Sequence, residues 1–251
     1  MIRFFADTDD ISENSIKLSP EDADHIRVLR LRPDEQFIIC DGNGTDYICR
    51  LGDRTGHSTA KIIDQIKSPG EPDIKCKVYM AYSKGDRLDY AVQKSVELGA
   101  HEIILFESGR CVAVPHDIPK KIARLQKISL ETAKQCNRGI IPKVSHGGSF
   151  DSIITDAAGS SGPAILFYEQ ENNLHIKEVL EQQFPPVQEQ KNIKTSSISI
   201  ITGSEGGFET HEIEQAQLKD IRIVSLGLRI LRSETAPVAA LAAIMYQTGN
   251  L

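Results

Sequence analysis

Two arginines and one glutamate lie within six residues near the end of the chain, in the segment 226–236. Arg229, Arg232 and Glu234 are interspersed with leucine and isoleucine, which predicts that they are partly buried. Buried charges need ion-pair partners, or they have a functional role that offsets the cost of burial. A guanidinium stays charged and presents planar donors, so it can stabilise negative charge that develops on a reacting ligand. The segment therefore predicts either an electrostatic catalytic site or a structural arginine–glutamate network that anchors the last helix.

A glycine-rich segment, Gly203-Ser204-Glu205-Gly206-Gly207, directly follows the apolar run 197–201. Ligands of parallel sheets bind at the carboxyl edge of the strands, and glycine lets a flat ligand approach the main chain closely. The segment is not a phosphate-binding P-loop, because no Gly-Lys-Ser/Thr follows, and it is not the dinucleotide GxGxxG motif. It predicts a ligand loop, with a plain connector to a helix near residue 210 as the alternative.

Two clusters of basic residues could contact phosphates, which supply much of the affinity for nucleic acids. Arg27, Arg30 and Arg32 lie within six residues, and Lys134 and Arg138 are four apart, a spacing that shares one helix face. The alternative for both clusters is a solvated surface. The first cluster also suits the C-terminal end of a helix, where cations interact favourably with the dipole.

The composition excludes several classes of protein. With 40% hydrophobic and 25% charged residues, the chain resembles ordinary globular proteins. No apolar run approaches the roughly 20 residues of a membrane span, and no signal peptide is evident, so we expect a cytoplasmic protein without a membrane partner. Five scattered cysteines without CxxC and seven histidines without HExxH predict buried thiols, and neither structural zinc nor disulfides. Because the net charge is −6, the chain could bind nucleic acid only through a local basic face.

The elements that must position these residues form two parts. Up to residue 70, the pattern predicts a small β-rich domain with a helix that begins at Ser19-Pro20. The turn signal DGNG joins two of its strands. Residues 68–72 are rich in proline and glycine and predict the domain boundary. The expected strands of this part cover 2–5, 36–40, 45–51 and 58–66.

From residue 73 on, strands alternate with helices, which predicts an α/β fold with a mainly parallel sheet. Ser233 is the expected N-cap of the last helix, with Pro237 in its first turn. Residues 185–194 predict a polar surface loop. Strands are expected at 75–82, 103–106, 164–168, 197–201 and 222–225, and helices at 86–98, 119–136, up to 184, from 210 and at 233–246.

Taken in order, these segments resemble the RsmE family, the 16S (small-subunit) ribosomal RNA uridine-N3 methyltransferases of the SPOUT superfamily. Seven pieces carry the resemblance: RFF at 3–5, HIRVLRLRPDEQF at 25–37, DGNG at 41–44, KSVELGAHEI at 94–103, ETAKQCNRGIIPKV at 131–144, GSEGGF at 203–208 and LGLRILRSETA at 226–236. The family usually has proline in place of Ser204 and often in place of Leu228. Both departures imply less stiff loops and weaker cofactor binding.

The resemblance implies a small N-terminal PUA-like β-barrel at 1–70 that helps to hold RNA. It implies a C-terminal SPOUT-type trefoil-knotted α/β methyltransferase domain at 73–251. S-adenosyl-L-methionine (SAM) is the implied methyl donor, with no metal. The implied partners are small-subunit rRNA or the 30S subunit, and a second copy of the chain in a homodimer whose two chains make each working site.

The resemblance also assigns roles to residues. The implied catalytic residues are Arg229, Arg232 and Glu234. The implied RNA-binding residues are Arg3, Arg27, Arg30, Arg32, Lys134 and Arg138. The implied SAM-binding residues lie in three loops and are Phe167, Tyr168, Glu169, Thr202, Gly203, Glu205, Gly206, Gly207, Leu226, Gly227, Leu228, Ile230 and Leu231.

In the implied reaction, uridine N3 must lose a weakly acidic proton, and negative charge spreads to O2 and O4. Arg229 or Arg232 would stabilise that charge, and Glu234 or Glu205 would accept the proton or orient the arginines. The base must be unpaired or flipped out. Two alternatives stay open: a non-catalytic RNA-binding or ribosome-assembly factor, and a SPOUT methyltransferase for another base or a ribose, because fold alone does not specify function.

Overall fold

The computed structural model describes residues 2–52, 58–185 and 197–251, which form two compact units. Unit 1 comprises Met1–Glu71 together with Ala133–Ile141, and unit 2 comprises Pro72–Thr132 and Pro142–Leu251. A short stretch from the middle of the sequence therefore completes the N-terminal unit. No pattern in the sequence separates this stretch from the domain that surrounds it.

Unit 1 contains a five-stranded sheet in the order β1-β3-β4-β5-β2. The hairpin between β3 and β4 is confirmed, and β3 also pairs with β1 in parallel. The sequence pattern misses β2, because three residues are too short to show alternation; β2 pairs with β5 through the buried Ile16. The strands are β1 (Arg3–Phe5), β2 (Ser15–Lys17), β3 (Phe37–Cys40), β4 (Thr45–Leu51) and β5 (Thr59–Lys67).

One α-helix, α1 (Pro20–Leu29), packs on this sheet, after the 3-10 turn η1 (Thr8–Asp10). Its predicted start is confirmed: the Ser19 hydroxyl accepts a hydrogen bond from the Asp22 N–H at 3.0 Å. Ile26 on this helix belongs to the unit's core, together with Phe4, Ile16, Phe37 and Ile39.

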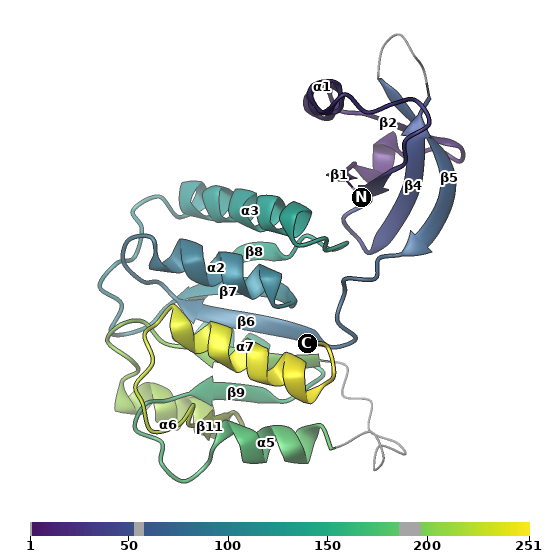
Figure 1. Cartoon of the computed structure of the whole chain (residues 1–251). Helices are drawn as coiled ribbons and strands as arrows, with labels where there is room; N and C mark the ends of the chain where they lie inside the picture. The colour runs from purple at the N-terminus through teal and green to yellow at the C-terminus, as the bar shows by residue number, and fades with distance from the viewer. Residues whose placement is uncertain (1, 53–57, 186–196) are drawn as a thin grey trace. The chain divides into compact units, whose positions relative to one another are not determined.

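Unit 2 is built on a six-stranded, wholly parallel sheet in the order β11-β9-β10-β6-β7-β8 (Figure 1). The predicted parallel α/β architecture is confirmed. The strands are β6 (Lys75–Ala81), β7 (Ala100–Glu107), β8 (Lys143–Ser149), β9 (Ala164–Phe167), β10 (Ser197–Thr202) and β11 (Arg222–Val224).

Helices cover both faces of this sheet. α2 and α5 pack beside α7 on one face, and α4 packs beside α6 on the other. Phe150, the first residue of α4, contacts Phe106 and Phe208 in the core on the side of α4 and α6. The helices are α2 (Arg87–Glu97), α3 (Ile118–Gln135), α4 (Phe150–Ala158), α5 (Ile176–Gln183), α6 (Thr210–Leu218) and α7 (Thr235–Gln247).

The structure corrects several predicted elements of unit 2. β8 and α4 are missed, because β8 carries two glycines and a histidine that hide its alternation. α7 begins at Thr235 after Glu234, so Ser233 is not its N-cap, while Pro237 does lie in the first turn. Residues 186–194 of the predicted surface loop lie outside the described residues.

The order of the strands decides where a ligand can bind. β9 lies between β11 and β10, so the carboxyl ends of these three strands are neighbours. The loops that follow them emerge at the same edge, where ligands of parallel sheets bind. The trefoil knot that the resemblance implies stays a prediction. Over the described parts of the chain, no helix has the length and apolarity to cross a membrane.

Candidate cofactor and substrate site

The loops after β9, β10 and β11 enclose a hollow of about 730 Å³, its open mouth included, which we call the first hollow. Of the residues implied to bind SAM, all but Glu205 and Gly206 line it. The structure thus brings together three loops that lie far apart in the sequence. Its lining comprises Phe167, Tyr168, Glu169, Asn172, Thr202, Gly203, Ser204, Gly207, Phe208, Ser225, Leu226, Gly227, Leu228, Arg229, Ile230, Leu231, Ser233 and Ala236.

The chemistry of the first hollow fits a small ligand with an apolar ring and a positive charge. Phe167 and Phe208 form buried parts of the wall, and the exposed carboxylate of Glu169 lies at the rim. Small-molecule sites typically have apolar walls and a few polar groups that fix the orientation of the ligand. SAM combines a flat adenine with a sulfonium cation, so the residues present suit it.

A tight turn explains why Glu205 and Gly206 are separate from the first hollow. The Gly207 N–H donates to the Ser204 carbonyl at 3.0 Å, which makes Glu205 and Gly206 the two central residues of the turn. Gly207 has φ +67°, a left-handed conformation that favours glycine. A Cβ atom at Gly207 would also overlap the carboxylate of Glu169. The turn therefore favours glycine at this position.

Ser204, where the related family usually has proline, makes a contact that proline could not make. Its hydroxyl donates to the Arg110 carbonyl at 3.2 Å, and the Arg110 guanidinium donates to the Gly206 carbonyl at 3.2 Å. The connection after β7 is thus fastened to the turn at two points. These hydrogen bonds restrain the loop in a different way from a proline ring.

A second hollow, of about 950 Å³ with its open mouth, adjoins the first on the other side of this turn. The two hollows share six residues: Glu169, Ser204, Gly207, Ile230, Leu231 and Ser233. Arg87, Glu205, Gly206 and Arg232 line the second hollow alone. A substrate in the second hollow would therefore lie beside a ligand in the first.

Two of the three implied catalytic residues line a hollow, and Glu234 lines neither. Arg229 is exposed and lines the first hollow, and Arg232 is exposed and lines the second. Glu234 lies just before α7 with 16% of its side chain exposed. Within the described residues, neither arginine forms an ion pair with a carboxylate, so the alternative of a structural network made by these arginines is wrong.

Arg87 is a residue of this site that the sequence pattern does not predict. Its Nη1 donates to Glu205 Oε1 at 2.9 Å, and its Nε lies 4.0 Å from Glu234 Oε1. The signal in the sequence is faint: Arg87 follows the carboxyl end of β6, which is the same edge of the sheet, but without the sheet order that edge cannot be located.

The electrostatics of Glu205 argue against a role as proton acceptor. Burial by itself raises the pKa of Glu205, but hydrogen bonds from the Lys84 N–H at 2.8 Å and from Arg87 outweigh it. The pKa of Glu205 therefore lies below its ordinary value, and the carboxylate is a weaker base.

Among the described residues, no group of three or more His, Cys, Asp and Glu side chains could hold a metal ion.

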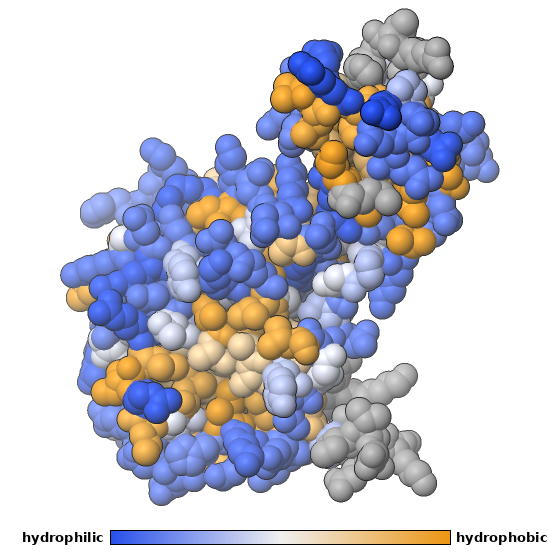
Figure 2. All heavy atoms as spheres, in the orientation of Figure 1, coloured by the Kyte–Doolittle hydropathy of each residue, from blue (hydrophilic) through white to orange (hydrophobic). Residues whose placement is uncertain are grey.

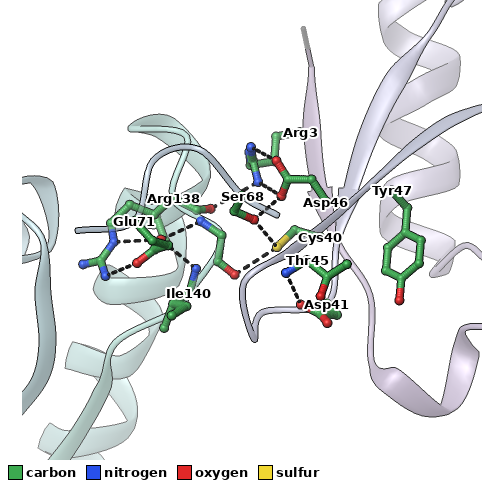
Figure 3. A network of polar contacts seen from close by, with 12 residues as sticks. Arg3, Cys40, Asp41, Thr45, Asp46, Tyr47, Ser68, Glu71, Arg138 and Ile140 are labelled. Atoms are coloured by element: carbon green, nitrogen blue, oxygen red, sulfur yellow. Dashed lines mark hydrogen bonds and ion pairs between the residues drawn. The ribbon is translucent and has the colours of Figure 1, made fainter. Parts of the chain in front are cut away.

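Two of the implied RNA-binding arginines are buried inside unit 1 (Figure 3). Arg3 forms a two-pronged ion pair with Asp46 at 2.6 Å, and their side chains are 4% and 0% exposed. Arg138 pairs with Glu71 at 2.7 Å, with 3% and 8% exposed. The structure gives Arg3 and Arg138 a structural role in place of the expected phosphate contacts, because their guanidinium groups face inward.

The network of Figure 3 fastens the stretch after α3 to the strands of unit 1. The Cys40 thiol donates to the Gly139 carbonyl at 2.9 Å, and the Glu71 carboxylate accepts from the N–H groups of Gly139 and Ile140 at 2.8 and 2.9 Å. α3 ends at Gln135, so Lys134 and Arg138 do not share a helix face as predicted. Cys40, Cys49 and Cys76 are buried as predicted, but Cys111 and Cys136 are only partly buried.

The other four implied RNA-binding residues of unit 1 are accessible. Arg27, Arg30 and Arg32 are exposed, and Lys134 is partly exposed. Arg27 lies 2.6 Å from Asp24 in an exposed ion pair, which contributes little to stability. Arg30 ends α1 in a left-handed conformation with φ +55°. Their role in RNA binding stays a prediction.

Comparison with known proteins agrees with both units. A family model described as RNA methyltransferase domain matches residues 70–245, and one described as RNA methyltransferase PUA domain matches residues 18–63. The chain is 33% identical to ribosomal RNA small subunit methyltransferase E of Mesomycoplasma hyopneumoniae, covering 95% of this chain and 96% of that protein. It is 31% identical to the protein of the same name from Bacillus subtilis, covering 93% and 91%.

Solved structures agree as well. The ribosomal RNA small subunit methyltransferase E of Neisseria gonorrhoeae, bound to S-adenosyl methionine, is 28% identical with a TM-score of 0.79, covering 98% of this chain and 97% of that one. A putative methyltransferase from Legionella pneumophila in complex with SAM is 25% identical, with a TM-score of 0.74 and coverage of 98% and 97%. The chain belongs to the RNA methyltransferase family with an N-terminal PUA domain that contains the ribosomal RNA small subunit methyltransferases E.

Proposed function

We propose that this chain is a SAM-dependent methyltransferase of small-subunit ribosomal RNA that methylates N3 of a uridine. The observation that carries the proposal is the pair of adjoining hollows at the carboxyl edge of the sheet. The first has walls that suit SAM, and the second presents Arg232 beside it. The names of the relatives and the PUA match of unit 1 support ribosomal RNA as the substrate.

The loops after β9, β10 and β11 would hold SAM in the first hollow. Bound there, SAM supplies an electrophilic methyl group on its sulfonium. Glu169 at the rim would attract the positive charge of the donor, and Phe167 and Phe208 offer apolar surface for the ring. Because both hollows share Glu169, Ser204 and Gly207, an acceptor in the second hollow would be aimed at the donor by the same loops.

Arg232 would stabilise the negative charge that spreads over O2 and O4 of the uracil ring as N3 loses its proton. Arg229, at the first hollow, would do the same from the side of the donor. We assign Glu234 as the acceptor of the N3 proton, because Glu205 already accepts two hydrogen bonds and the pKa of Glu205 is lowered. The target uridine must be unpaired or flipped out for N3 to reach the donor.

Exposed arginines on unit 1 would hold the RNA backbone. Arg27, Arg30 and Arg32 lie close together in the sequence at the end of α1 and just after it, and all three are exposed. A guanidinium binds phosphate with planar donors. On a chain with net charge −6, such a local cluster would contribute affinity while the bulk charge limits non-specific binding.

We also propose that the working form is a homodimer in the cytoplasm. α7 carries no charged residue, although Val238, Ala239, Ala242 and Ala243 are only partly buried and Tyr246 is 76% exposed. Figure 2 shows apolar residues gathered over this helix. A helix that is apolar all round is normally covered on all sides. Light scattering on a gel-filtration column is expected to give twice the chain mass, and a monomer at micromolar concentration would refute the dimer.

One experiment tests the proposed activity. Purified protein is incubated with labelled SAM and either 30S subunits or naked rRNA from cells that lack the enzyme, and the modified nucleotide is mapped by mass analysis. We expect label at N3 of a single uridine. Label at another base or at a ribose would refute the N3 assignment, and no label on either substrate, with RNA binding intact, would favour a non-catalytic assembly factor.

A further inference from the structure

Arg87 lies within ion-pairing distance of two carboxylates, that of Glu205, which lines the second hollow, and that of Glu234. It is the first residue of α2, and residues 82–86 connect it to the carboxyl end of β6. Its side chain is 41% exposed. The guanidinium donates to Glu205 Oε1 at 2.9 Å and lies 4.0 Å from Glu234 Oε1. One side chain from a third connection thus contacts the loop after β10 and the residue that precedes α7.

Without Arg87, Glu205 would have another cation, Arg232, within the same hollow. Glu205 and Arg232 both line the second hollow, and Glu234 is two residues from Arg232 in the sequence. The carboxylates are only 21% and 16% exposed, so water screens them incompletely. An unpaired, partly buried carboxylate has a strong tendency to recruit a nearby guanidinium, because the two-pronged pair is a strong hydrogen-bonding arrangement.

In the structure, Arg232 pairs with neither carboxylate in the described part of the chain, and it is exposed at the second hollow. We propose that Arg87 is a positioning residue: by holding Glu205 it prevents that carboxylate from pairing with Arg232, and so leaves the Arg232 guanidinium for the acceptor base. This inference rests on the proposed function, since it assigns the second hollow to the acceptor.

Arg87 also fixes the shape of the wall that the two hollows share. Glu205 is a central residue of the turn that Ser204 and Gly207 close, so the ion pair with Arg87 and the hydrogen bond from the Lys84 N–H restrain the tip of that turn. Arg87 does not line the first hollow. Its loss should therefore affect the acceptor reaction far more than the binding of SAM.

The test compares Arg87→Gln, Arg87→Lys and the double variant Arg87→Gln/Glu205→Gln with the wild type. Arg124→Gln is the matched control, because Arg124 also bonds one carboxylate of α2, Asp89, at 2.7 Å, but lies outside both hollows. For each full-length protein, kcat and KM for 30S subunits or rRNA, Kd for SAM by calorimetry, and the thermal midpoint are measured.

We expect Arg87→Gln to lower kcat for RNA methylation by about 10- to 100-fold, the range for a lost supporting contact, with Kd for SAM within about twofold of wild type. Arg87→Lys should recover part of the loss, since lysine keeps the charge but not the planar fork. The double variant should be faster than Arg87→Gln, because it removes the carboxylate that would capture Arg232. Arg124→Gln should match the wild type.

Three results would overturn the inference: wild-type kcat in Arg87→Gln, a loss of SAM binding in step with the loss of rate, or a double variant as slow as Arg87→Gln at an unchanged thermal midpoint. If Arg87→Gln fails to fold, Arg87→Lys is compared with Arg87→Lys/Glu205→Gln instead. The double variant should then be faster than Arg87→Lys, and an equal kcat would overturn the inference. A failure of the proposed function gives a different result, because the wild type itself would then transfer no label to RNA.

Discussion

Replacing Gly207 with alanine should weaken SAM binding by a predictable amount. Gly207 has φ +67°, and an L-residue in this conformation costs about 1 kcal/mol or slightly more relative to glycine. The new Cβ would also overlap the Glu169 carboxylate and lie 3.0 Å from its Cδ atom. Because Glu169 is the flexible end of a side chain, it can move aside, but it then leaves its place at the rim of the first hollow.

The backbone penalty is present in the free and the SAM-bound protein alike, so it lowers stability and not affinity. The displacement of Glu169 from the first hollow should cost about 1–2 kcal/mol in SAM binding, which corresponds to about a 5- to 30-fold rise in Kd. Gly249→Ala is the matched control. Gly249 has φ +73°, so it carries the same backbone penalty, but a Cβ added there would meet no atom within 4 Å, and Gly249 lines neither hollow. Both variants should lose similar stability towards urea.

Calorimetric titration of SAM into each protein measures the difference directly. We expect only Gly207→Ala to show the raised Kd. The reasoning is refuted if Gly207→Ala binds SAM as tightly as wild type, since the turn would then tolerate a side chain. It is equally refuted if Gly249→Ala shows the same rise, since the loss would then come from general destabilisation and not from the wall of the hollow.

Three further predictions concern other parts of the molecule. Asp46→Asn should lower the free energy of unfolding by about 3–5 kcal/mol in urea, because Arg3 is left buried without its partner. Burial by itself raises the pKa of Asp46, but hydrogen bonds from Arg3 and Ser68 outweigh burial, so the pKa of Asp46 is lowered in the folded protein. The stabilisation from this ion pair should therefore be fully present above the unfolded-state pKa of about 3.9 and be lost as the pH falls through the folded-state pKa. Asp46→Asn should not show this part of the pH dependence. Arg232→Ala should lower kcat at least tenfold with Kd for SAM unchanged, and a wild-type rate would exclude it from catalysis. Arg30→Ala should reduce the slope of log affinity for RNA against log salt by about one, and an unchanged slope would exclude a phosphate contact.

Local patterns in the sequence predict most elements of the fold. Ser19 before Pro20 marks the start of α1 correctly, and DGNG marks the hairpin between β3 and β4, because caps and turns depend on a few adjacent residues. The misses are elements with weak local signals: β2 has three residues, and β8 contains two glycines. The start of α7 is misplaced by two residues, since Ser233 is only one of several polar residues ahead of the helix.

Whether a charged side chain is buried in an ion pair or exposed to solvent is the property that the sequence predicts least reliably. Arg3 and Arg27 look alike in the sequence, and both are predicted to contact RNA. Arg3 is 4% exposed against Asp46, while Arg27 lies on the exposed end of α1. The partner that buries Arg3 is 43 residues away and comes from a different strand. Long-range pairing of this kind depends on strand register and leaves no local trace.

The parallel α/β architecture, the glycine-rich turn and the arginines beyond β11 follow from the sequence alone, because hydrophobic period and glycine placement act over a few residues. Which side of the turn each residue faces is decided only in the folded chain. The sheet order β11-β9-β10-β6 places three loops around the first hollow and brings Arg87 from the end of β6 to Glu205. The physical reason is that neighbouring parallel strands gather their carboxyl ends at one edge whatever their separation along the chain.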